Sequence, residues 1–124
     1  MAASTVALRT GPLLALVGMV FGIYMAASGD HTAAPAHAHL NLLGFVGTLV
    51  MGLVYRLDAG IDSGMLAKIQ IWLWIICAIV MFPSLVMLLW GNPAYEIGTK
   101  ITSIGAVISM VIFAYNAFRI SASR

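Results

Sequence analysis

The sequence predicts an all-α membrane protein with four transmembrane helices, and two observations support this fold class. First, 62% of the 124 residues are hydrophobic and 8% are charged, whereas soluble domains carry about 25% charged residues. Second, Asp, Glu, Lys and Arg are absent from residues 10–29, 31–55, 69–95 and 101–118. Because a spanning helix needs about 20 mostly apolar residues, each window holds one helix. We expect one domain over residues 1–124, a four-helix bundle with helices at about 12–27, 36–56, 65–90 and 97–119.

The first helix, residues 12–27, carries Gly18 and Gly22 four residues apart on one face. This spacing lets two helix backbones approach closely in lipid, so this face is expected to be the packing face. Arg9, the apolar run and the small residues after it also have the pattern of a secretory signal. The apolar run is longer than a usual signal core, and we therefore expect it to remain as a helix.

The second helix, residues 36–56, is expected to begin near Pro35, because proline is favourable in the first helical turn. With about 100° between successive residues, the small and polar side chains form one stripe of His37, Asn41, Gly44, Thr48, Gly52 and Tyr55. His39 lies on the opposite, aliphatic side with Leu43, Val46, Val50 and Leu53. We expect the first stripe to point into the bundle and the second to meet lipid or another subunit.

The third and fourth helices also have one small or polar stripe each. In residues 65–90 the stripe contains Gln70, Trp74, Cys77, Met81 and Ser84, and in residues 97–119 it contains Thr102, Ala106, Ser109, Phe113 and Asn116. Pro83 is expected to kink the third helix, because proline removes one backbone hydrogen bond. Glu96 and Lys100 are four residues apart and are expected to pair at the start of the fourth helix.

The cations predict the orientation, because cytoplasmic loops carry an excess of Lys and Arg. With a cytoplasmic N-terminus and four spans, the inner side holds Arg9, Arg56, Lys68, Arg119 and Arg124, and the outer side holds Lys100. Both termini are therefore expected to be cytoplasmic, with the protein in a bacterial inner membrane and its histidines near the periplasmic side. The formal net charge of +2 gives no nucleic-acid site, because the cations lie at helix ends; the expected partner is the lipid bilayer.

Few residues could carry chemistry. No carboxylate lies within a span to orient a histidine for nucleophilic catalysis, and no ionisable Asp, Glu, Lys or Arg lies at mid-membrane as ion transport would require. We therefore expect no catalytic residue among these groups. The remaining candidates are the three histidines, His31, His37 and His39.

Three hypotheses explain these histidines. In the simplest, they lie at the headgroup level, half solvated, and satisfy groups at the helix end. In the second, His31, His37 and His39 bind copper or zinc, although residues two apart on a helix point in nearly opposite directions. In the third, His37 and His39 are axial ligands of haem iron, and their opposite directions let each ring reach a different haem.

A haem would also need polar groups at its rim for the propionates. The donors expected at the outer end include Trp90 and Lys100, and Asn41 and Gly44 lie on the same stripe as His37. We therefore include these four residues with the two histidines in the candidate cofactor site.

Residues 36–57, "AHAHLNLLGFVGTLVMGLVYRL", resemble the haem–copper oxidase superfamily, in particular the small four-helix proteins similar to the catalytic subunit of the C-family oxidases. The matching motif is His37-Ala38-His39 followed by Asn41, similar to the family's His-x-His pair and to the His-x-Asn at its low-spin haem ligand. The resemblance implies that this chain corresponds to one four-helix arc of the twelve-helix oxidase subunit. It further implies a homotrimer with haem between the chains.

The chain departs from the oxidase pattern in one important respect. The oxidases carry three further histidines for copper on other helices, and this chain has no histidine after His39. We therefore expect a b-type haem protein, cytochrome-like, that transfers electrons with a redox partner or binds oxygen or nitric oxide. If it is an enzyme, it is a haem-dependent oxidoreductase without the copper site. The alternative is a haem-free assembly or structural partner that binds copper or zinc.

Overall fold

The structure, a computed structural model, describes residues 1–121 and contains in that range four helical spans long and apolar enough to cross a membrane. The spans are α1 (Ala3–Ser28), the continuous run of α2 (Ala34–His39), η1 (Leu40–Gly47) and α3 (Thr48–Tyr55), then α5 (Met65–Leu89), and finally α6 (Glu96–Arg119). The short helices α4 (Ala59–Asp62) and η2 (Pro93–Tyr95) lie in the connections. The predicted all-α class with four membrane-spanning helices is confirmed.

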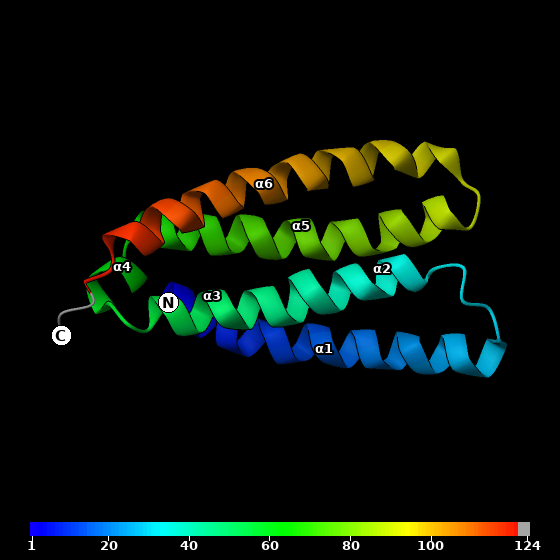
Figure 1. Cartoon of the computed structure of the whole chain (residues 1–124), viewed down its shortest axis with the longest axis horizontal. Helices are drawn as coiled ribbons and strands as arrows, with labels where there is room; N and C mark the ends of the chain where they lie inside the picture. Colours follow the sequence, from blue (N-terminus) through cyan, green and yellow to red (C-terminus); the bar gives the residue numbers. More distant parts are fainter. Residues whose placement is uncertain (122–124) are drawn as a thin grey trace.

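The spans lie side by side, with α5 at the centre of the packing (Figure 1). α6 packs along α5, and α1 packs along α3 and η1, while α5 also contacts η1, α2 and α3. The N-terminus and the end of α6 lie at one end, and the α1–α2 and α5–η2 connections lie at the other. The cytoplasmic location of the first end stays a prediction, and Arg124, one of its supporting cations, lies outside the described residues.

The expected inward stripes are the buried ones. On α5 the buried set includes Gln70, Trp74, Cys77, Met81 and Ser84, and on α6 it is Thr102, Ala106, Ser109 and Asn116. Phe113 is partly buried and packs against the same core. Helix α5 continues through Pro83 as one helix. The periodic spacing of small and polar residues therefore predicted the buried faces of α5 and α6 correctly, because each helix buries only the side that meets its neighbours.

Helix α1 begins at Ala3 rather than near Pro12, so the expected start was wrong by nine residues. The added turns are buried: Ala3, Val6 and Ala7 belong to the same core cluster as Tyr55. Asp62 of α4 also caps this helix, since its Oδ1 accepts a hydrogen bond from the Ser4 amide at 2.7 Å and its Oδ2 accepts one from the Ser4 hydroxyl. A side chain from a distant loop thus satisfies a helix end that local sequence leaves uncapped.

Substitution of Asp62 by alanine should lower the free energy of unfolding by about 1 kcal/mol, the usual value of an N-cap. The amide and hydroxyl of Ser4, which is fully buried, would lose their acceptor. Thermal unfolding followed by circular dichroism measures the effect, and hydrogen exchange should accelerate in the first turn of α1. Asp30→Ala, which removes an exposed carboxylate, is the matched control. Equal stability of the two variants would contradict the capping role.

The second span winds as a π-helix over Leu40–Gly47. In a π-helix the hydrogen bonds join residues five apart and the turns are wider, so each residue advances by less than the expected 100° of an α-helix. Leu43, expected on the outer face with His39, instead packs against the core. Its carbonyl accepts hydrogen bonds from the Thr48 hydroxyl at 3.0 Å and from Trp74 Nε1 at 2.9 Å. The Thr48 bond lies within the second span, and the Trp74 bond holds the widened turn against α5.

Candidate functional site

His37 and Asn41 lie against a glycine-lined surface of α1. Asn41 Nδ2 is 3.1 Å from His37 Nε2, so the amide donates to this ring nitrogen when it is unprotonated. A Cβ built on Gly22 would lie 3.1 Å from the same nitrogen, and a Cβ on Gly18 would overlap Asn41 Oδ1. The ring of Phe21 stacks on His37, with 6.4 Å between the ring centres. The inner histidine is thus a packed side chain whose Nε2 already has a partner.

His39 has the opposite environment. Its ring is exposed, and its Nδ1 is 2.7 Å from the Pro35 carbonyl oxygen, one helical turn earlier. Since a carbonyl only accepts, Nδ1 carries the proton in this bond, and in the neutral tautomer that fits it the lone pair is on Nε2. No other hydrogen bond of this ring is present within residues 1–121. The expected separation of the two histidines onto opposite sides of the helix is what the structure shows.

His31 lies in the connection between α1 and α2, away from both helix faces. It is exposed, and its Nδ1 is 3.3 Å from the Gly29 carbonyl oxygen. In the part of the chain that the structure describes, no three His, Cys, Asp or Glu side chains are grouped as a metal site would require. The copper or zinc site of His31, His37 and His39 is therefore not preassembled in this conformation.

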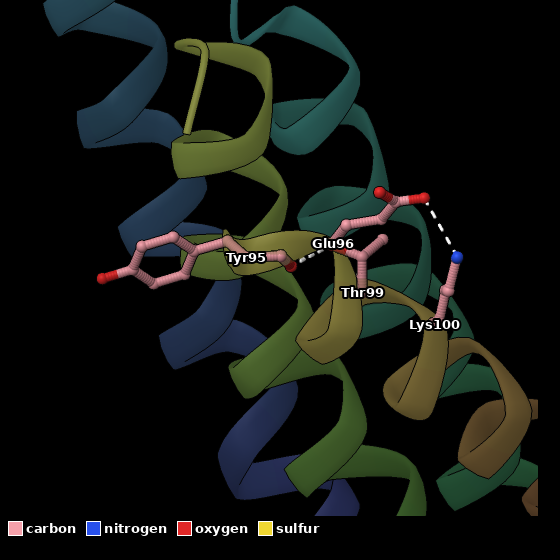
Figure 2. A network of polar contacts seen from close by, with 4 residues as sticks. All are labelled: Tyr95, Glu96, Thr99 and Lys100. Atoms are coloured by element: carbon pink, nitrogen blue, oxygen red, sulfur yellow. Dashed lines mark hydrogen bonds and ion pairs between the residues drawn. The ribbon is translucent and has the colours of Figure 1, made fainter. Parts of the chain in front are cut away.

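The remaining expected site residues have partners of their own. Gly44 is buried at the α1 interface, where a Cβ would lie 3.2 Å from both Leu14 Cδ1 and Leu40 Cδ1. Lys100 pairs with Glu96, as expected, with 3.0 Å between Nζ and Oε1, and Figure 2 shows this pair on the outside of α6 beside Thr99. Within residues 1–121, Lys100 makes no ion pair or side-chain hydrogen bond with a histidine.

Trp90, also expected at the haem rim, ends α5 and lines a hollow of about 570 Å³. Asp30 is part of the lining of this hollow. Hydrogen bonds from the Thr32 side chain and amide hold the pKa of Asp30 below its ordinary value, so this carboxylate is ionised at neutral pH. Because like charges repel, the hollow disfavours a haem propionate, and Trp90 does not join His39 in one anion-binding rim.

A polar network links α3, α5 and α6 in the core, and the pairing of its members was not predicted from the sequence. Tyr55 donates to Gln70 Oε1 at 2.7 Å, and Gln70 Nε2 donates to Ser109 Oγ at 3.0 Å. Asn116 Nδ2 donates to Tyr55 at 3.1 Å, and Arg119 donates to Asn116 Oδ1 at 2.8 Å. No buried side-chain nitrogen or oxygen within the described range lacks a partner. The network is therefore satisfied internally and holds three helices in register.

Comparison of the chain with protein-family models, with curated proteins and with solved structures found no match. His31 and His39 are both exposed and bonded to a backbone carbonyl through Nδ1, but the bond of His39 is shorter, 2.7 Å against 3.3 Å, and His39 lies on a membrane-spanning helix.

Proposed function

We propose that this protein is a membrane-embedded b-type haem protein that transfers electrons or binds a diatomic gas, with His39 as a ligand of the iron. The supporting observation is the geometry of His39, whose Nδ1–H is bonded to the Pro35 carbonyl while Nε2 is directed away from that bond on an exposed ring. Metal-ligating histidines take this form, because a hydrogen bond at one ring nitrogen fixes the tautomer and raises the basicity of the other.

The surface that continues from His39 suits a porphyrin. Leu42, Val46 and Val50 are about half exposed and extend along the same span, so they offer apolar contact next to the imidazole. Histidine is a common axial ligand of haem iron. When bound, the haem would supply a one-electron redox centre and an iron position for a small gas. The residues of this chain would bind it and set the orientation of one axial ligand.

A second copy of the chain is the proposed source of the remaining haem contacts. His37 is held by Asn41 between α2 and α1, so it is not free to join His39 at the same haem. The exposed face of the second span is free to meet a neighbour, and a closed cyclic assembly would bury it. A homotrimer is the arrangement that the resemblance of residues 36–57 to the haem–copper oxidases suggests.

The test is an absorption spectrum of the full-length protein purified from membranes of cells supplied with a haem precursor. We expect a Soret band and a b-type pyridine haemochrome, and His39→Ala should abolish both. His31→Ala is the matched control, because it removes an exposed histidine of the neighbouring connection, and it should keep the haem. In His37→Ala we expect most of the haem to remain and the thermal stability to fall, since this ring is a packing residue.

A colourless protein under these conditions would overturn the proposal. Elemental analysis of the same preparation tests the alternative. Copper or zinc without haem, lost in each single histidine variant, would instead support a metal-binding assembly or structural partner.

A further inference from the structure

The hollow that contains Trp90 lies at the end of the bundle where α1 and α5 finish. It has a volume of about 570 Å³ and is lined by Tyr24, Asp30, Thr32, Leu89, Trp90 and Gly91. Tyr24 comes from α1, Asp30 and Thr32 from the connection that follows it, and Trp90 from the end of α5. The hollow thus combines side chains from segments about sixty residues apart in the sequence, as the numbering of its lining shows.

The charge of this hollow is negative. Asp30 is the charged residue of its lining, and its carboxylate is ionised at neutral pH because hydrogen bonds from Thr32 lower its pKa. The amide of Thr32 donates to Asp30 Oδ1 at 3.0 Å, which fixes the carboxylate in the connection. The cation Lys100 is paired with Glu96 on α6 and does not line the hollow.

The two aromatic side chains give the hollow a second preference for cations. Tyr24 and Trp90 both line the hollow and are both about half exposed. The negative faces of tyrosine and tryptophan rings attract ammonium groups, especially alkylated ones. Anchoring at the membrane interface would account for the aromatic rings alone, but not for an ionised carboxylate placed with them.

We propose that this hollow binds an organic ammonium group of the ethanolamine or choline type, through the carboxylate of Asp30 and the rings of Tyr24 and Trp90. Such a group belongs to phospholipid headgroups and also to soluble amines. The site is independent of His39 and of the proposed haem.

Isothermal titration calorimetry of the full-length protein in a nonionic detergent, with choline chloride against sodium chloride at equal ionic strength, tests the binding. We expect saturable binding of choline alone. Asp30→Asn should weaken it about fivefold, as loss of an exposed ion pair does, and Trp90→Leu about threefold, as loss of a cation–π contact does. Glu96→Gln, which removes a carboxylate outside the hollow, should leave the affinity unchanged. Thermal melts verify that each variant folds.

Native mass spectrometry after reconstitution distinguishes the two sources of the ammonium group. Retention of phosphatidylethanolamine over phosphatidylglycerol, lost in Asp30→Asn but not in Glu96→Gln, would assign the site to a lipid headgroup. Choline binding without lipid retention would assign it to a soluble amine. Equal heats for choline and sodium, or equal affinity in Asp30→Asn and Glu96→Gln, would overturn the proposal.

Discussion

Replacement of Gly18 by leucine should lower the free energy of unfolding by about 3 kcal/mol, the upper part of the range for overpacked cores. Gly18 is buried on α1, and a Cβ at this position would overlap the Asn41 amide oxygen. A leucine side chain would have to move α1 away from η1, and both His37 and Asn41 would lose their contact surface. Detergent-induced unfolding followed by circular dichroism measures the loss.

Two variants separate this specific overlap from a general effect of bulk. Ala26→Leu adds a similar side chain to the exposed face of the same helix, and it should change stability by less than about 0.5 kcal/mol. In a double-mutant cycle, Asn41→Ala should recover part of the loss caused by Gly18→Ala, because it removes the overlapping atom. Additive effects of these two substitutions would show that the close approach of Gly18 and Asn41 is wrong.

Replacement of Gln70 by leucine should cost about 1–3 kcal/mol, although the volume of the side chain is nearly preserved. Gln70 is fully buried, and its side chain bonds Tyr55, Ser109 and the sulfur of Met51. Leucine would leave the Tyr55 hydroxyl proton without an acceptor in the apolar core, where an unpaired donor is expensive. A lower midpoint in detergent-induced unfolding is the expected result.

A matched serine pair on α6 tests the same network independently. Ser109 donates to the Gln70 carbonyl at 2.8 Å, across to α5, whereas Ser103 donates to Thr99 within its own helix. Ser109→Ala should therefore destabilise the protein by about 0.6 kcal/mol, the average for hydrogen bonds between membrane helices. Ser103→Ala should have little effect. Unfolding midpoints that coincide would mean that the network does not hold α6 to α5.

Hydrophobic and charge patterning predicted much of this fold. The charge-free windows predicted four spans, and three of them agree with the observed spans within about two residues at both the start and the end. The start of α1 could not be predicted from local pattern, because Asp62 caps it from another part of the chain. The π-helical turn was likewise missed, since Trp74 on a different helix contributes one of the bonds to the Leu43 carbonyl.

The candidate site shows the same division. The opposite bearings of His37 and His39 follow from a spacing of two residues on a helix, so the sequence by itself determined that the two rings lie on opposite sides of it. The hydrogen bond between Asn41 and His37, and the packing of both side chains on the glycines of α1, could be established only from the tertiary structure. The tertiary structure was also required to find that Asp30 and Trp90 line one hollow.

The physical reason is the range of the interactions. Helix periodicity and the cost of burying charge act between near neighbours in the chain, so the sequence determined the number of spans and the face that each one buries. Hydrogen-bond partners, close approaches at glycine and shared hollows depend on how separate helices meet. Only the tertiary structure decided that His37 packs on the glycines of α1 with Asn41 as its hydrogen-bond partner.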